Sequence, residues 1–180
     1  MMVLAATLFL LACMKEQSSD LLLQKNLNSS NAMEKNMVTR PMYVNFYATP
    51  DMTVAPVQCL PAQLGTFFVG GGMKIYGNAT HIGLVDADES FGRVTQCLFG
   101  PAAYQLSTRN TGQVAAANGD LMYFSSEDVT SVIDGSLTGV VTLTGGTGRF
   151  MNSSGYVNIK GTVNFQTGAV QWTGSGEITY

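Results

Sequence analysis

Apolar and polar residues alternate along the last part of the chain, and this alternation is typical of strands that bury one face. Residues 155–165 place Gly, Val, Ile, Gly, Val and Phe at every second position, with polar residues and one Tyr between them. Residues 170–180 and 137–143 follow the same rule, so we predict three strands here. The turn signals that separate predicted strands are Asn118-Gly119, Asp134-Gly135, Gly145-Gly146 and Thr167-Gly168.

The earlier part of the chain alternates less regularly, yet it shows no long segment with helical periodicity. Glycines recur on the apolar faces of the predicted strands, where they relieve crowding in a small, strongly bent barrel. Pro101 is the last proline, so none interrupts the later strands. The predicted fold is therefore all-β, a small antiparallel β-barrel of about eight strands over residues 41–180. The further strands are expected near residues 42–48, 53–58, 65–69, 79–87, 91–98, 112–117 and 120–126.

The first residues have the pattern of an export signal. Residues 3–12 form an uncharged apolar run, which suits a signal peptide and is too short for a bilayer, which needs about 20 residues. The run ends in Leu10-Leu11-Ala12-Cys13, which resembles the lipobox of bacterial lipoprotein precursors, although no Lys or Arg precedes it. This resemblance implies that residues 1–12 are a signal peptide and that acyl chains such as palmitate are attached to Cys13. An ordinary signal peptide with an incidental cysteine is the alternative.

A polar segment separates the export signal from the predicted barrel. Residues 13–40 are rich in Asn, Ser, Gln, Lys and Glu, and they hold too little apolar surface to offset the entropy of ordering. We interpret them as a flexible tether after the lipidated Cys13. The expected partner of the anchor is a membrane, and the expected location is the bacterial cell envelope, at the outer membrane or the cell surface.

Cys59 and Cys97 are the cysteines that remain when Cys13 is set aside. An exported protein folds in an oxidising compartment, so an even pair invites a disulfide. Closing a loop of about 38 residues would contribute roughly 3–4 kcal/mol in the chain-entropy model. Two buried free thiols are the alternative, because cysteine also packs as a small apolar residue and nothing in the sequence brings these two together.

Charge is sparse and scattered along the chain. Only 12% of the residues are charged and the net charge is −3, so the chain lacks the basic patch that nucleic acid requires. His81 is the single histidine, and without a nucleophile elbow or further zinc ligands we expect it to be a hydrogen-bonded structural residue. Asp86, Asp88 and Glu89 lack the spacing of a calcium loop and are interpreted as a solvated turn. We expect no metal and no cofactor.

Three segments follow one another in a specific order: residues 77–83 (GNATHIG), 116–120 (AANGD) and 145–150 (GGTGRF), ahead of a closing GSGEI at 174–178. Together they resemble bacterial secreted proteins related to the allene oxide cyclase and dirigent barrels, over residues 65–180. The resemblance implies an eight-stranded antiparallel barrel. Plant members of that superfamily close or guide reactive intermediates in an apolar cavity, but their polar catalytic residues have no counterparts that can be placed on this sequence.

The segment GGTGRF also has a structural interpretation of its own. Glycine adopts positive φ without penalty, and we expect Gly146 or Gly148 to do so. Phe150 directly follows the turn and is expected to plug one end of the barrel, while Arg149 pairs with a carboxylate or with carbonyls. An anion-binding nest of backbone N–H groups is the alternative.

The apolar faces of the last two predicted strands point to the barrel interior or to a covering layer. Eight strands leave room inside only for side chains or one small ligand, and the glycines of that face (Gly155, Gly161, Gly174 and Gly176) are expected to leave space. The predicted lining of a ligand cavity is Val157, Ile159, Phe165, Trp172 and Ile178.

These patterns favour a lipid-anchored envelope barrel that binds a small apolar ligand or a partner. Few ionisable side chains occupy the apolar faces, so a non-catalytic protein is favoured and the question of enzymatic activity stays open. The alternatives are an isomerase or cyclase acting on an apolar substrate in the cavity, and a purely structural envelope protein.

The lipobox makes a direct prediction about Cys13. Replacing Cys13 by Ser should release soluble protein or leave an uncleaved precursor, because each buried CH₂ of an acyl chain contributes about 0.8 kcal/mol to membrane binding. Membrane fractionation and mass spectrometry of the mature N-terminus check this. An unmodified N-terminus at another residue would contradict it.

Overall fold

The computed structural model describes residues 37–60, 67–100 and 102–180, with a compact unit from Val38 to Tyr180. Cys13, the predicted signal peptide and most of the predicted tether lie outside the described residues. The strands are β1 (Thr39–Pro50), β2 (Val57–Gln58), β3 (Phe68–Val69), β4 (Gly72–Ala79), β5 (Gly83–Gly100), β6 (Gln105–Ala116), β7 (Leu121–Ser131), β8 (Ser136–Gly146), β9 (Ser154–Val163) and β10 (Val170–Thr179). A short 3-10 helix, η2 (Gly148–Phe150), follows β8.

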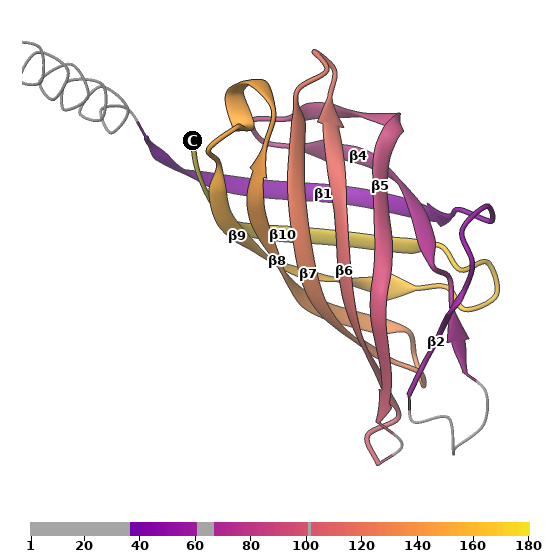
Figure 1. The fold of residues 1–180 in the computed structure, drawn as a ribbon. Helices are drawn as coiled ribbons and strands as arrows, with labels where there is room; N and C mark the ends of the chain where they lie inside the picture. The colour runs from indigo at the N-terminus through magenta and orange to yellow at the C-terminus, as the bar shows by residue number, and fades with distance from the viewer. Residues whose placement is uncertain (1–36, 61–66, 101) are drawn as a thin grey trace, which may run out of the picture. The chain divides into compact units, whose positions relative to one another are not determined.

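Eight of these strands form one closed antiparallel barrel, in the order β1-β10-β9-β8-β7-β6-β5-β4 (Figure 1). Most neighbours around the barrel are also neighbours in the sequence, and β1 closes the sheet by pairing with both β10 and β4. The remaining strands, β2 and β3, pair only with each other as a two-stranded sheet. The predicted all-β barrel of eight strands is therefore confirmed.

The alternation in the last strands has the predicted orientation. In β9, Val157 and Ile159 are buried while Asn158 and Lys160 are exposed. In β8, Leu137 and Leu143 are buried, and between them half-buried residues alternate with exposed ones. Inward-facing apolar residues of this kind form the main hydrophobic core together with β1, whose Met42, Val44, Phe46 and Ala48 are all buried.

Two predicted strands are wrong: of residues 53–58 only Val57–Gln58 form a strand, because the chain turns before them, and the predicted strand at 79–87 contains a turn in its middle. β4 ends at Ala79 and β5 begins at Gly83, and His81 between them has a φ of 71°. β4 itself was missed, and Gly77 stands at one of its inward positions. Gly77 lies opposite Phe46 of β1, its φ is 121°, and an added Cβ would first collide with the Asn45 carbonyl oxygen of that strand. The close approach of the β1 backbone therefore explains why glycine stands at this position.

The segment GGTGRF closes one end of the barrel as predicted. Gly148 has a φ of 52°, whereas Gly146 is not among the glycines with positive φ. Phe150 is completely buried in the core, with its ring centroid 6.0 Å from that of Tyr180. Arg149 pairs with Asp120 (Nε to Oδ2, 3.6 Å), and its guanidinium lies 4.8 Å from the centroid of the Phe150 ring.

None of the helices in the described ranges has the length and apolar content needed to cross a membrane.

The turn at Gly148 yields a stability prediction. Gly148→Ala should lower the free energy of unfolding by about 1–3 kcal/mol, because φ is positive there and the new Cβ would collide with the Asp120 carboxylate. Urea melts measure this. Gly100→Ala is the matched control, since its Cβ would meet nothing closer than 3.8 Å. Equal destabilisation by the two variants would show that the turn conformation has no special importance.

Candidate ligand-binding cavity

The barrel interior is filled at one end and open at the other. Beyond the core around Phe150, a cavity of about 630 Å³ extends to the end at which β1 finishes in Pro50. A second cavity of only about 40 Å³ lies deeper among apolar side chains. The two share part of their lining, so one layer of side chains separates them and forms the floor of the large cavity. This layer consists of Ile75, Phe124, Val141 and Trp172.

Most of the wall above this floor is apolar. Val163 and Val170 line it from β9 and β10, and Trp172 contacts Phe46 edge-on at a centroid distance of 5.8 Å. Aromatic side chains surround the mouth: Phe68 and Phe165 are more than half exposed, and Phe67 is 43% exposed. An apolar molecule that enters this mouth would therefore exchange water contacts for apolar ones along most of its length.

A polar patch interrupts this apolar wall on the adjacent strands β6 and β7. The register pairs Thr108 with Asp128 and Asn110 with Ser126, so all four side chains face the interior side by side. The Asn110 amide (Nδ2) donates to Asp128 Oδ2 at 2.7 Å and to Ser126 Oγ at 3.0 Å, and it lies 3.5 Å from Thr108 Oγ1. Ser126 Oγ in turn donates to Asp128 Oδ2 at 2.9 Å. The patch is thus one connected network.

Asp128 is the electrostatic centre of this patch. Burial raises its pKa to about 6, and the hydrogen bonds from Ser126 and Asn110 offset only part of that effect. Its second oxygen, Oδ1, is buried without a hydrogen-bond partner. That oxygen occupies space left by Gly139, the residue opposite Asp128 on β8, where an added Cβ would collide with it. The strand pairing therefore accommodates a carboxyl group whose charged form is poorly solvated.

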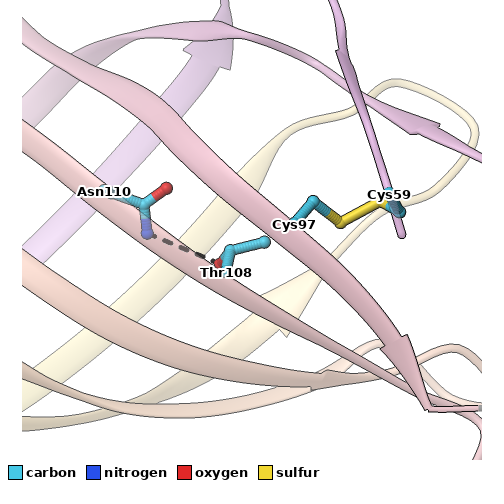
Figure 2. Close-up of a disulfide and its surroundings, with 4 residues drawn as sticks. All are labelled: Cys59, Cys97, Thr108 and Asn110. Carbon is cyan, nitrogen blue, oxygen red and sulfur yellow. Dashed lines mark hydrogen bonds between the residues drawn. A yellow bond between two sulfur atoms is a disulfide. The ribbon is translucent and has the colours of Figure 1, made fainter. Parts of the chain in front are cut away.

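A disulfide supports the mouth of the cavity. The structure joins Cys59 to Cys97 of β5, and Figure 2 shows the bridge beside Thr108 of β6, the residue paired with Cys97. The end of β5 extends past its pairing with β4, and there Leu60 is its hydrogen-bonding partner. Leu60 N–H donates to the Cys97 carbonyl, and the Leu60 carbonyl accepts from Phe99 N–H at 2.7 Å. The bridge thus fixes the segment that carries β2 next to the polar patch.

An ion pair fixes the start of the same segment. Arg93 of β5 reaches Asp51 (Nη1 to Oδ2, 3.3 Å), directly after β1 ends. Hydrogen bonds from the Thr53 hydroxyl and Thr53 N–H are the main reason that the pKa of Asp51 is lowered. Asp51 N–H also donates to the Gly72 carbonyl at 2.8 Å. The segment between β1 and β4 is therefore attached to the barrel at its start, through Asp51, and again near its middle, through Cys59 and Leu60.

The structure divides the five predicted cavity residues. Ile159, Phe165 and Trp172 line the large cavity. Val157 lines only the small one, and Ile178 is completely buried in the core and lines neither, because these two belong to the filled half of the barrel.

The glycines of that face do not create the space, contrary to the prediction. A Cβ at Gly161 would lie 2.7 Å from the Trp172 Cβ, and one at Gly174 would lie 2.7 Å from Val157 Cγ1. These glycines allow close packing of β9 on β10, and none of the four (Gly155, Gly161, Gly174 and Gly176) lines the large cavity.

Sequence reasoning missed the polar patch entirely. The predicted strands at 112–117 and 120–126 stopped short of Thr108, Asn110 and Asp128, because polar residues at inward positions hide the alternation. A signal was nevertheless present in the outward residues. Arg109 and Glu127 pair across the outer face of β6 and β7 (Nε to Oε1, 3.0 Å), and such opposite charges indicate a cross-strand pair.

The other candidate residues lie away from the cavity. His81 Nε2 donates to the Pro41 carbonyl at 3.0 Å, and its Nδ1 accepts from Tyr180 Oη at 3.2 Å, so it is a hydrogen-bonded structural residue, as expected. Asp86, Asp88 and Glu89 are exposed but lie within β5, at an irregularity in its pairing with β6, so their interpretation as a turn is wrong; Asp88 N–H donates to Asp86 Oδ1 at 3.1 Å. Among the described residues, no group of His, Cys, Asp and Glu is arranged to hold a metal ion.

Comparison of the chain with protein-family profiles, with curated proteins and with solved structures finds no match. The resemblance to the allene oxide cyclase and dirigent barrels stays a prediction.

The buried carboxyl of Asp128 predicts a distinctive pH dependence. Its pKa is higher in the folded protein (about 6) than the ordinary value of 3.8, so the folded state loses stability as the pH rises between these values. Asp128→Asn should remove this loss and raise the free energy of unfolding near neutral pH by about 1–3 kcal/mol. Denaturant melts across this pH range measure the difference.

Glu127→Gln is the control, because this neighbouring carboxylate is exposed on the outer face. Its pH profile should match that of the wild type. Parallel profiles for wild type and Asp128→Asn would contradict the prediction.

Proposed function

We propose that this protein is a lipid-anchored barrel of the bacterial cell envelope that binds one small, largely apolar molecule inside its open half. The observation that carries the proposal is the cavity of about 630 Å³, which has an apolar wall and a single polar patch. Small-molecule sites have about 300–1,000 Å³, mostly apolar walls and a few polar groups that fix orientation. Eight-stranded barrels of other proteins are known to hold one such ligand.

A purely structural role is less well supported. A structural barrel gains stability by filling its interior, since side chains that line an empty space lose dispersion contacts on one side. Here the filled half shows that this sequence packs tightly where its side chains are large, as at Met42, Met122 and Phe150. The open half instead combines empty volume with a buried carboxyl, and both features reduce stability unless a ligand compensates.

An isomerase or cyclase is the second candidate, and it rests on Asp128 alone. A pKa of about 6 places this carboxyl in the range useful for general acid–base catalysis. Catalysis on a bound substrate commonly uses two or more convergent ionisable groups. Asp128 is the one ionisable residue among the described residues that line the cavity, so binding is the better supported function.

The anchor belongs to the same proposal. Acylation at Cys13 would hold the barrel at a membrane, where apolar molecules are concentrated. The exposed aromatic residues at the mouth, Phe67, Phe68 and Phe165, would let such a molecule pass from apolar surroundings into the cavity.

The test uses Trp172, the single tryptophan of the chain, which lies in the floor of the cavity. The apolar probe N-phenyl-1-naphthylamine should quench its emission saturably. Gly92→Leu should weaken binding about tenfold or more, because Gly92 lines the cavity and an added Cβ there would meet only Ile75 and Phe124, both at 3.9 Å.

Thr173→Leu provides the matched control. Thr173 is next to the reporter but faces outward, so the same enlargement leaves the cavity unchanged and binding should persist. Absence of saturable quenching in the wild type, with the fold intact by circular dichroism, would contradict the proposed function.

A further inference from the structure

We infer that the cavity selects amphiphiles whose polar head donates hydrogen bonds and carries no negative charge, such as long-chain alcohols and amines, and rejects carboxylates such as fatty acids. This inference rests on the proposed function and specifies the ligand class of the same site.

The first argument is the placement of the polar groups. Thr108, Asn110, Ser126 and Asp128 come from two neighbouring strands and form one patch on an otherwise apolar wall. Thr130, paired with Leu106 further along β7, adds a hydroxyl toward the mouth. A ligand that fills this space therefore presents a polar end to β6 and β7, and an apolar body to the opposite wall at Val170 and Trp172.

The second argument is the sign of the charge. Asp128 receives hydrogen bonds from Asn110 and Ser126, which are neutral donors. The described lining of the cavity contains no Lys, Arg or His. The nearby cations are engaged elsewhere: Arg93 pairs with Asp51 and Arg109 pairs with Glu127 on the outer face. A second carboxylate would therefore face an uncompensated negative charge in a poorly solvated space.

The third argument is the hydrogen-bonding capacity of the patch. The Asn110 amide N–H groups are already committed to Asp128 and Ser126, and the Ser126 hydroxyl also donates to Asp128. The donors of Asn110 and Ser126 thus point to Asp128, and the hydroxyls of Thr108 and Thr130, which also line the cavity, are left to meet a ligand as donors or acceptors. A hydroxyl or ammonium head can donate to the oxygens of the patch, whereas an anionic head can only accept and would lie beside the Asp128 carboxylate.

The buried carboxyl makes this selectivity dependent on pH. Because burial raises the pKa of Asp128 to about 6, the patch is negative above that pH and neutral below it. Discrimination against an acid should therefore be strong at about pH 8 and weak at about pH 5, where Asp128 gains its proton.

The experiment measures displacement of N-phenyl-1-naphthylamine from the full protein by dodecanol, dodecylamine and dodecanoate, with Trp172 emission as the readout. At about pH 8 dodecanol and dodecylamine should compete at least about tenfold better than dodecanoate. Asp128→Asn should reduce the gap between dodecanol and dodecanoate to roughly threefold or less. Glu127→Gln, whose carboxylate is on the outer face, should keep the wild-type selectivity.

The outcomes separate this inference from the proposed function. Failure of the probe itself to bind would refute the proposed function. Binding of the probe with equal displacement by all three amphiphiles at about pH 8 would leave the proposed function standing and overturn the ligand class. Selectivity that survives unchanged in Asp128→Asn would likewise overturn it, because the discrimination would then have another source.

Discussion

β1 has a hydrogen-bonded partner on each of its two edges, and the rest of the structure depends on this double pairing. With β10 on one side and β4 on the other, the sheet has no free edge, and every inward side chain of eight strands shares one interior. Residues distant in the sequence thereby become neighbours, as Phe46 and Trp172 do. The closed sheet also fixes the width of the interior, so the sizes of the side chains decide where it is filled and where it is open.

The two halves of the interior follow from this constraint. Large side chains such as Met42, Met122 and Phe150 fill the end closed by η2. Toward the mouth, the inward positions of β6 and β7 carry Thr108, Asn110, Ser126 and Asp128. These side chains leave part of the interior unfilled, and they need polar partners. A network that satisfies one oxygen of Asp128 and leaves the other without a partner reduces folded-state stability. Such a local loss of stability is expected where a protein's activity requires a particular group.

Predictability from sequence follows the same division. The strands from 137 to 180 were predictable because one face is continuously apolar or glycine, and the turn glycines between them were recognisable. β4 was missed although its inward positions are apolar or glycine; its Gly77 closely approaches the β1 backbone at Asn45, a contact with another strand that no local pattern shows. The patch at Asp128 was missed because polar residues at inward positions imitate a loop. The link between Cys59 and Cys97 depends on Leu60 pairing with β5, which no local pattern specifies.

The pairing of β1 with β10 has a consequence for how the barrel assembles. Each other pair around the sheet joins strands that are close in the sequence, such as β4 with β5, whereas Thr39 and Thr179 meet across 140 positions. Contacts of such long separation form late, because closing a long loop is entropically unfavourable until other contacts support it. The pairing along this seam between β1 and β10 is thus expected to form last during folding. Since Trp172 lies on that seam, a nascent chain lacking β10 has an open sheet, and the floor beneath its polar patch lacks its tryptophan.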